Sequence, residues 1–237
     1  MANSKKIALV TGASSGIGAA ISRNLCEKGY HCILASRSEK KLEALAKSLI
    51  GDGFECSVVI VDVGSEASVD ALFEASIKIG HVSLVINNAG LGIFSKIEES
   101  SVEDWDEQIN INLRGSFLVA RKYIPSMQKK KAGMLVFMNS VAGNFGYPYS
   151  SAYVASKFGL RGFSESLRNE LRKDNIKVIS VHPGAIDTAF WDKVSADFPR
   201  EEMLTPEMIA ESVVHAVESP GAAVIEDLTI RRVGGDF

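Results

Sequence analysis

Cysteine is scarce in this chain and forms no recognisable redox or metal motif. The 237 residues contain three cysteines, Cys26, Cys32 and Cys56, an odd number without a C-x-x-C pair. A disulfide framework of the kind that holds small secreted domains together is therefore excluded. We expect the three thiols to be reduced and structural, as in a cytoplasmic protein.

Long apolar runs and an excess of positive charge are also absent. No hydrophobic stretch approaches the roughly 18 residues of a membrane span, and the run at 7–10 is too short for the core of a signal peptide. The chain has 26 Lys and Arg against 29 Asp and Glu, a net charge of −3. A general nucleic-acid binder should carry a basic surplus. We therefore expect neither a membrane nor a nucleic-acid partner.

Short hydrophobic runs alternate with helical patterns along the whole chain. The runs lack the polar alternation of half-exposed strands, which is typical of parallel strands covered on both faces. Apolar residues recur at helical spacing between them, for example in 66–79, 103–127, 151–173 and 207–218. The expected strands lie at 7–10, 32–35, 58–61, 84–86, 134–138, 178–181 and 224–225.

This alternation predicts a single α/β domain spanning 1–237. The expected architecture is a Rossmann-type, doubly wound parallel sheet of about seven strands with helices on both faces. A cofactor half covers about 1–140, and a catalytic and substrate-loop half covers about 140–237.

A glycine-rich turn follows the first expected strand. Gly12, Gly16 and Gly18 lie in the segment 11–18, immediately before a helical pattern. Glycine lets the backbone turn tightly and lets a pyrophosphate approach without a Cβ in the way. The free N–H groups and positive dipole end of the following helix favour the same phosphates. The segment is therefore predicted to bind a dinucleotide.

Four motifs taken together resemble the classical short-chain dehydrogenases/reductases. They are the glycine turn, Asn-Asn-Ala-Gly at 87–90, Ser140, and Tyr-Val-Ala-Ser-Lys at 153–157. The resemblance covers essentially the whole chain. Extended relatives carry an added substrate domain, for which 237 residues leave no room.

The end of the second expected strand indicates which nicotinamide cofactor is bound. An NAD site places a carboxylate there to bind the ribose 2′-hydroxyl, but this chain has Ser36 followed by Arg37. A guanidinium can pair with a 2′-phosphate that a carboxylate would repel, and the hydroxyls of Ser14 and Ser38 can assist. The predicted cofactor is NADP(H); the alternative is that Arg37 only faces solvent at the start of a helix.

Resemblance to the family assigns further contacts along the carboxyl edge of the sheet. Asp62 and Val63 would hold the adenine, 87–90 would line the groove, and Ile186 and Thr188 would bind the nicotinamide carboxamide. Lys157 would also hold the nicotinamide ribose. The expected cofactor residues are Gly12, Ser14, Ser15, Gly16, Ile17, Gly18, Arg37, Ser38, Asp62, Val63, Asn88, Ala89, Gly90, Tyr153, Lys157, Pro183, Gly184, Ile186 and Thr188.

Tyr153 and Lys157 are the candidate reacting pair. At helical spacing of i and i+4 they project from one face, about one turn apart. An ammonium next to a phenol lowers the pKa of the phenol from about 10, which would suit it to general acid–base catalysis. Ser140 follows the fifth expected strand, where its hydroxyl can orient a substrate carbonyl. By resemblance, Asn112 completes the set, perturbing its helix and holding a water that links Lys157 to solvent; Asn110, two residues earlier, is the alternative for this position.

The segments expected to border the substrate are rich in aromatic residues. Because specificity in such folds comes from loops, these residues favour a hydrophobic ketone, aldehyde or acyl chain. The alternative is that about half of them only pack the loop bases. The candidates are Phe94, Phe145, Tyr147, Tyr149, Phe190 and Trp191.

The histidines do not compete with this interpretation. His31, His81, His182 and His215 include no pair at metal-ligand spacing, so no metal is predicted. Structural or surface roles are expected, although His182 ends a strand close to the cofactor groove.

The leading hypothesis is an NADPH-dependent carbonyl reductase with Tyr153 as general acid and base. A catalytically silent NADP(H)-binding sensor and a nucleotide-sugar epimerase or dehydratase are the alternatives. Resemblance implies a homodimer or homotetramer formed through helices at 103–127 and 151–173. Acyl-carrier protein is a weaker partner candidate, resting on a basic surface of 129–131, Arg172 and Lys173.

Overall fold

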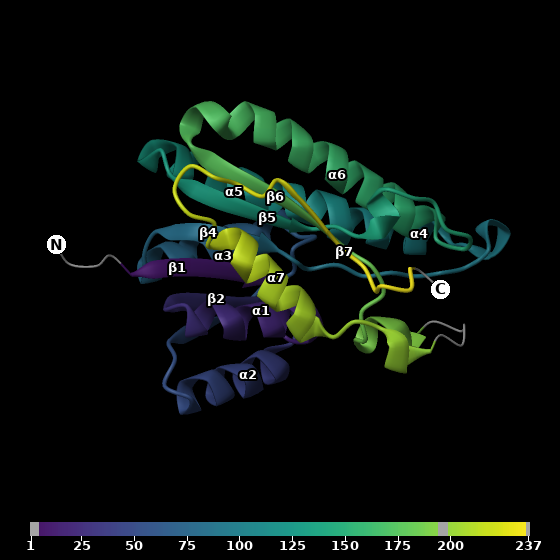
Figure 1. Cartoon of the computed structure of the whole chain (residues 1–237), viewed down its shortest axis with the longest axis horizontal. Coiled ribbons are helices and arrows are strands. Elements are labelled where there is room, and N and C mark those ends of the chain that lie inside the picture. Colours follow the sequence, from purple (N-terminus) through teal and green to yellow (C-terminus); the bar gives the residue numbers. More distant parts are fainter. Residues whose placement is uncertain (1–4, 194–198, 236–237) are drawn as a thin grey trace.

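Seven parallel strands form one sheet at the centre of the molecule (Figure 1). The computed structural model describes residues 5–193 and 199–235. The strand order is β3-β2-β1-β4-β5-β6-β7, which reverses direction between β1 and β4, as in a doubly wound fold. The strands are β1 (Lys6–Thr11), β2 (Tyr30–Ser36), β3 (Cys56–Ile60), β4 (Val82–Asn87), β5 (Gly133–Met138), β6 (Ile176–Pro183) and β7 (Asp227–Ile230).

Helices cover both faces of the sheet, so the predicted architecture is confirmed. One hydrophobic core lies beneath α1 (Gly16–Glu27), α2 (Glu39–Gly51) and α7 (Pro206–Val217). The other lies beneath α3 (Glu66–Ile79), α5 (Gly115–Lys130) and α6 (Ser151–Leu171), and α4 (Val102–Gln108) packs against α6. Burial on both faces explains why the central strands are apolar at almost every position.

The last strand differs from the sequence prediction. Residues 224–225 were expected to form it, but β7 is Asp227–Ile230, paired only with β6 at the edge of the sheet. Its residues alternate between exposed and half-buried, a period-2 pattern that a search for continuous apolar runs overlooks. Val224 and Ile225 instead pack against the core beneath α1, α2 and α7.

The long helix expected at 103–127 is interrupted. A π-helical segment, Ile109–Arg114, separates α4 from α5. Such wide turns are rare and are frequently found at functional sites. This one carries Asn112 on its inner side, fully buried, and its side chain bonds to the loop after β4. A helical repeat of hydrophobic residues cannot show a wide turn, because the same face remains buried on either side of it.

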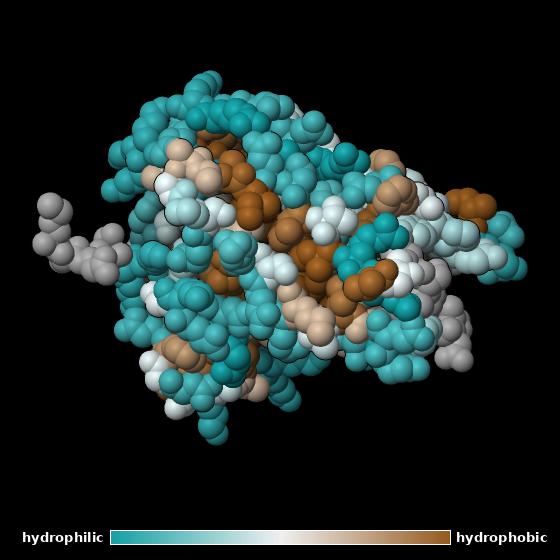
Figure 2. Space-filling model, in the orientation of Figure 1, coloured by the Kyte–Doolittle hydropathy of each residue, from teal (hydrophilic) through white to brown (hydrophobic). Residues whose placement is uncertain are grey.

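The surface is polar over most of the face drawn in Figure 2, but a band of hydrophobic residues runs diagonally between α6 and α7, along β7. Within 5–193 and 199–235, no helix has both the length and the apolar character required to cross a membrane.

Candidate active site

The glycine turn after β1 is locked against the segment after β4. The Thr11 hydroxyl accepts hydrogen bonds from the backbone N–H groups of Asn88 and Ala89. The Asn88 side-chain amide donates to the carbonyls of Thr11 and Gly12. Gly12 has φ +66°, and a Cβ there would lie 2.8 Å from Asn88 Nδ2. Only glycine fits, because both the left-handed backbone and the close approach exclude a side chain.

Gly18 serves packing rather than the cleft itself. A Cβ at this position would lie 2.3 Å from the Gly12 carbonyl oxygen, so its absence lets α1 approach the turn. Gly16, at φ +53°, would place a Cβ 3.1 Å from Thr188 Cγ2. The turn, the start of α1 and the segment after β6 therefore pack against one another.

The N-terminus of α1 opens into a cleft of about 530 Å³. Ser15, at the N-cap position, makes no side-chain cap, and no acidic residue lies in the first turn. The first N–H groups of a helix form a positive site for an anion, and here Gly16 and Ile17 line the cleft. The other predicted cofactor residues that line it are Gly12, Ser14, Ser15, Arg37, Ser38, Asp62, Val63, Asn88, Ala89, Gly90, Tyr153, Lys157, Pro183 and Thr188.

The far end of this cleft carries a cation and hydroxyls. Arg37 is exposed and lines the cleft beside Ser36 and Ser38. The Ser36 hydroxyl accepts a hydrogen bond from the Ser38 backbone N–H, so a neutral group stands where a carboxylate would bind a ribose 2′-hydroxyl. A glycine cradle, an uncapped helix start and a guanidinium at the ribose end fit a dinucleotide with an additional phosphate.

Tyr153 lies where this cleft meets a second cavity, because its side chain lines both. Lys157 lines the cleft, and Ser140 lines the second cavity. The Lys157 ammonium lies 5.6 Å from the centroid of the Tyr153 ring and donates to the Met138 carbonyl at 2.9 Å. The structure therefore brings three of the four predicted catalytic residues together at one junction.

The expected lowering of the Tyr153 pKa is wrong for the protein by itself. Burial raises the pKa of this phenol to about 12, and a hydrogen bond with Ser140 lowers it by a smaller amount. The rings of Phe94 and Phe190 pack against it at 5.7 and 5.6 Å between centroids, which is the apolar surrounding that disfavours a phenolate. Burial also lowers the pKa of Lys157, to about 8.

The Asn112 side chain hydrogen-bonds to the backbone of the loop after β4. Its side chain accepts a hydrogen bond from the Leu91 N–H and donates to the Leu91 carbonyl, both at 2.8 Å, and it also donates to the Ser156 hydroxyl at 3.0 Å. A Cβ on Gly90 would be 3.2 Å from Asn112 Oδ1 and 3.7 Å from Lys157 Nζ. The predicted perturbation of the helix is present, and Asn112 lies close to the lysine.

Gln108 is a functional residue that the sequence analysis missed. It is buried, one turn before Asn112, and its side-chain oxygen accepts a hydrogen bond from the Ile93 N–H at 3.0 Å. Gln108 and Asn112 thus fix the loop that carries Phe94. Two amides spaced by four residues in a helical segment were the available signal.

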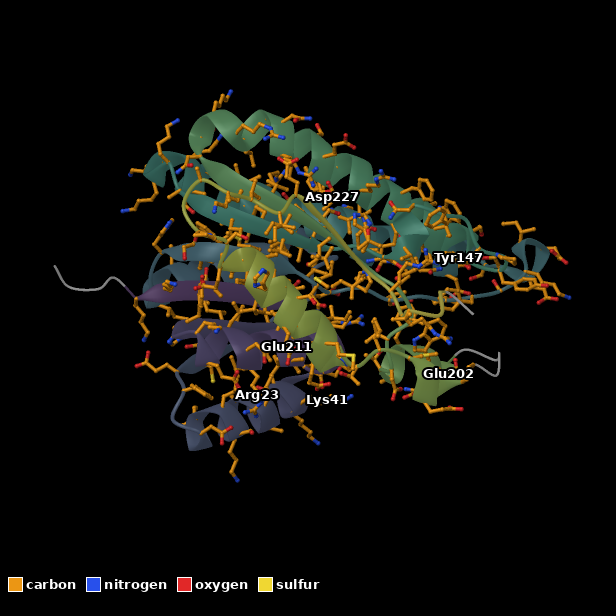
Figure 3. All side chains as sticks on the ribbon, viewed as in Figure 1. Arg23, Lys41, Tyr147, Glu202, Glu211 and Asp227 are labelled. Carbon is orange, nitrogen blue, oxygen red and sulfur yellow. The ribbon has the colours of Figure 1, made fainter. Side chains whose placement is uncertain are left out.

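The second cavity has a volume of about 750 Å³ and a largely aromatic wall. Phe94 and Trp191 are nearly parallel, with an interplanar angle of 7°, and Phe190 packs edge-on against both. Tyr147 lies on the side of the molecule toward which the strands run (Figure 3). The predicted pocket residues that line the cavity are Phe94, Tyr147, Tyr149, Phe190 and Trp191.

Three predicted positions lie elsewhere than expected. Phe145 is 52% exposed and lines neither the cleft nor the second cavity, because it sits in the turn that leads away from the site. Gly184 and Ile186 line the second cavity rather than the cleft. They lie in the segment after β6, and Ile17 of the glycine-rich segment lines the same cavity.

The cysteines and acidic residues give no sign of a metal centre. Cys26, Cys32 and Cys56 are free thiols, the first two buried and the third half-buried. Among the residues described, no three His, Cys, Asp or Glu side chains are arranged to hold a metal ion.

The comparison with known proteins identifies the family. A family model described as short chain dehydrogenase matches residues 6–198, and the chain belongs to this family. It is 34% identical over 230 residues to an uncharacterized oxidoreductase of Staphylococcus epidermidis, covering 97% of this chain and 98% of the relative. It is also 34% identical over 241 residues to the sepiapterin reductase of Chlorobaculum tepidum, covering 98% of each chain.

Two solved structures show the same fold. An alcohol dehydrogenase from Thermococcus sibiricus, complexed with 5-hydroxy-NADP, superposes with a TM-score of 0.89 at 33% identity, covering 97% of each chain. A variant of the actinorhodin polyketide ketoreductase with NADPH has the same TM-score at 28% identity, covering 98% of each chain.

Proposed function

We propose that the protein is an NADP(H)-dependent oxidoreductase that reduces the carbonyl group of an apolar substrate to an alcohol. The observation that carries this proposal is the position of Tyr153, shared by a dinucleotide-shaped cleft and an aromatic cavity. Relatives of the same family support the choice of cofactor, since two structural neighbours contain NADP-type ligands.

The residues of the cleft are suited to holding the cofactor. The N–H groups at the start of α1 would bind the pyrophosphate, and the Arg37 guanidinium would pair with the 2′-phosphate. Lys157, buried beside Gly90 and Tyr153, would hold the ribose next to the nicotinamide. The bound cofactor would supply the hydride.

Ser140 and Tyr153 would act on the substrate oxygen. The two hydroxyls can donate hydrogen bonds to one carbonyl oxygen placed between them, which orients the carbonyl and stabilises negative charge developing on it. A phenol with a pKa of about 12 is protonated at neutral pH and is therefore a competent proton donor. Lys157 stabilises the phenolate left behind after the proton has moved.

The aromatic cavity favours substrates with flat or bulky apolar groups. Phe94, Phe190 and Trp191 present ring faces and edges to it. Apolar and aromatic surface of this kind contributes binding energy mainly by burial. Among the described lining residues only Lys96 is charged, and it pairs with Glu99 at 3.5 Å; the neutral remainder of the lining does not favour a charged sugar or nucleotide substrate.

A catalytically silent NADP(H) sensor is the alternative function. It would use the same cleft, but it would not require Ser140, Tyr153 and Lys157 to converge. Oxidation of NADPH with a panel of diketones, aldehydes and 3-oxoacyl thioesters separates the two functions. Turnover of at least one of these substrates supports the reductase, whereas tight NADPH binding without any turnover supports the sensor.

We propose that the protein works in the cytoplasm as a homodimer or homotetramer. The three free thiols support a reducing compartment, and exposed apolar side chains on α4, α5 and α6 support self-association. Those side chains are Val102, Trp105, Phe117 and Phe158. Size-exclusion chromatography with light scattering tests this assembly.

The basic surface considered for acyl-carrier protein is partly neutralised within the chain. Lys131 pairs with Asp174, and Arg172 pairs with Glu226 at 2.7 Å. These ion pairs reduce the positive field available to an acidic partner. A free small-molecule carbonyl is therefore the substrate form that we favour.

A further inference from the structure

His182 occupies an unusual position behind the proposed active site. It is the penultimate residue of β6, directly before Pro183, and is 2% exposed. Its ring borders neither the cofactor cleft nor the aromatic cavity. A buried imidazole normally requires partners for both of its ring nitrogens.

Each ring nitrogen faces an oxygen atom. Nδ1 lies 3.3 Å from the carbonyl oxygen of Ser140, and Nε2 lies 3.5 Å from Asp227 Oδ1. A carbonyl oxygen can only accept, so Nδ1 must carry a proton for the first contact to be a hydrogen bond. The contact to Ser140 therefore selects one tautomer of the ring.

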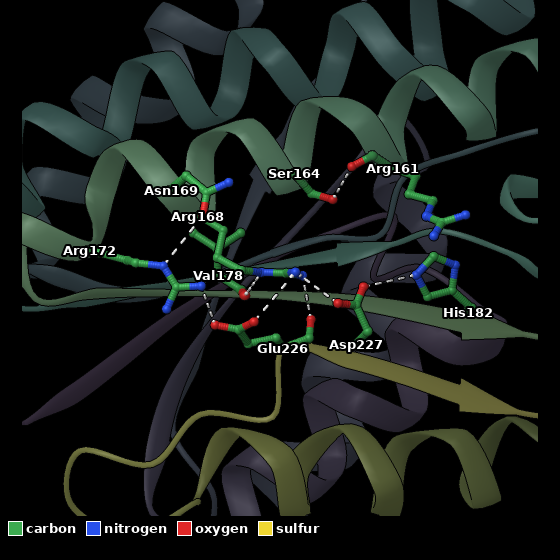
Figure 4. A network of polar contacts seen from close by, with 9 residues as sticks. All are labelled: Arg161, Ser164, Arg168, Asn169, Arg172, Val178, His182, Glu226 and Asp227. Atoms are coloured by element: carbon green, nitrogen blue, oxygen red, sulfur yellow. Dashed lines mark hydrogen bonds and ion pairs between the residues drawn. The ribbon is translucent and has the colours of Figure 1, made fainter.

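The Asp227 carboxylate is held in turn by α6 (Figure 4). Arg168 donates from Nη1 to Asp227 Oδ2 at 2.8 Å, from Nη2 to the Glu226 carbonyl at 2.6 Å, and from Nε to the Val178 carbonyl at 3.2 Å. This arginine is only 8% exposed. Since its guanidinium is committed on all sides, it fixes the carboxylate that His182 contacts.

On the other side of His182 the contacts reach Ser140, the residue that we propose to bind the substrate oxygen. The Ser140 carbonyl also accepts a hydrogen bond from the Gly143 N–H at 2.8 Å, and the Ser140 hydroxyl accepts one from the Ala142 N–H at 3.1 Å. With two donors on its carbonyl, the Ser140 backbone has little freedom to rotate. His182 and Gly143 thus contact the Ser140 carbonyl, while the Ala142 N–H of the turn Val141–Gly143 contacts its hydroxyl.

We infer that His182 is a positioning residue, which donates from Nδ1 to the Ser140 carbonyl and so aims the Ser140 hydroxyl at the substrate oxygen. In this tautomer Nε2 has no proton to donate to Asp227, so the Arg168–Asp227 ion pair packs behind the imidazole without a hydrogen bond to it. The edge strand β7 and α6 thereby support the reaction centre from behind. This inference rests on the proposed function, because it assigns Ser140 to the substrate oxygen.

The charged groups around the imidazole have opposite effects on the pKa of His182. Burial is the main cause that lowers the pKa of His182, and Arg161 on α6 lowers it further, whereas Asp227 and the Ser140 carbonyl raise it. Arg168 and Glu226 complete the charged surroundings. Because that pKa is lowered, the ring carries one proton at neutral pH, and the geometry places it on Nδ1, whose 3.3 Å contact to the Ser140 carbonyl is shorter than the 3.5 Å approach of Nε2 to Asp227.

Three substitutions separate positioning from packing. His182→Asn retains an N–H group near the place of Nδ1, His182→Gln places its N–H near Nε2, and His182→Leu removes both donors at similar volume. Because one hydrogen bond contributes roughly the equivalent of a tenfold rate change, the Gln and Leu variants should lose about tenfold in kcat, with KM and NADPH affinity nearly unchanged.

His182→Asn should recover most of that loss, and His215→Leu, an exposed histidine on α7, is the control that should behave like the wild type. Equal kcat values for the wild type and the Gln and Leu variants would overturn the inference while leaving the reductase function intact. An equal loss in all three His182 variants, together with weaker NADPH binding, would mean packing alone and would also overturn it.

NMR of the histidine ring nitrogens tests the same inference without turnover. We expect a protonated Nδ1 on His182 at neutral pH, and a further fall in its pKa in Asp227→Asn, which removes the negative charge. A ring protonated only on Nε2 would contradict the inference, even if none of the carbonyl substrates is reduced and the proposed function itself has failed.

Discussion

The cofactor cleft and the aromatic cavity share Tyr153 but are built in different ways. The cleft is formed by turns at the carboxyl ends of strands, where glycines, backbone N–H groups and Asn88 meet at fixed distances. The cavity is formed by side chains from three loops, with Phe94, Tyr147 and Trp191 among them. The scaffold thus dictates where the cofactor binds, whereas loop side chains determine the substrate.

The largest expected effect falls on the residue that the two sites share. Tyr153→Phe removes the proton donor, and general acid catalysis contributes about 10²–10⁴-fold, so kcat should fall by at least that factor. NADPH affinity measured by fluorescence should remain within a fewfold, since the ring is retained. Tyr149→Phe is the control, because Tyr149 lines the same cavity but is 63% exposed. A comparable fall in kcat in this variant would show that Tyr153 has no special role as the proton donor.

Lys157 should contribute a pH-dependent cost to folding. Its pKa is about 8 in the folded protein against 10.5 when unperturbed, so the folded state binds fewer protons between these values and stability rises with pH across that window. We compare the free energies of unfolding of the wild type and of Lys157→Met. As the pH rises from 8 to 10.5, the difference between them should shift in favour of the wild type by up to about 3 kcal/mol. Parallel curves in urea titrations would show that the ammonium is not desolvated.

Arg37 should decide the choice of cofactor. Replacing its guanidinium with the carboxylate of Arg37→Asp substitutes repulsion for a charge-assisted contact, and NADPH should bind about a hundredfold more weakly. NADH affinity should change little. Lys41→Asp, on α2 and outside the cleft, should change neither affinity, and equal losses of NADPH and NADH in Arg37→Asp would refute the assignment.

Substitutions in the aromatic cavity should change KM for the substrate and leave kcat nearly unchanged. Phe94→Ala should raise KM for an aromatic ketone by about 10- to 100-fold, because burial of a ring of this size contributes roughly 1.5–3 kcal/mol. Phe145→Ala should leave KM unchanged, since that ring is exposed outside the cavity. A larger change for Phe145 than for Phe94 would show that the loops rearrange around the substrate.

The same contrast explains what could be predicted from the sequence. Strands buried on both faces and a glycine turn leave local signals, so the sheet and the cleft were predictable from the residues themselves. The catalytic roles of Ser140, Tyr153 and Lys157 were predicted from the resemblance to the family. The π-helical segment around Asn112, the role of Gln108 and the exposure of Phe145 depend on contacts between distant segments.

The pKa of Tyr153 likewise depends on contacts that residue spacing in the sequence does not reveal. Spacing from Lys157 predicted a lowered value, but Phe94 and Phe190 pack against the ring from other loops, and burial outweighs the lowering caused by the Ser140 hydrogen bond. A short helical spacing therefore identified the partners without giving the direction of the shift.

A crystal structure of the protein with NADP⁺ and an alcohol product would test the central claim most directly. We expect the alcohol oxygen within about 2.6–3.2 Å of both the Ser140 and the Tyr153 hydroxyls, with the rest of the product against Phe94 and Trp191. An alcohol oxygen bound beyond hydrogen-bond reach of Tyr153 would contradict the assignment of this phenol as the proton donor.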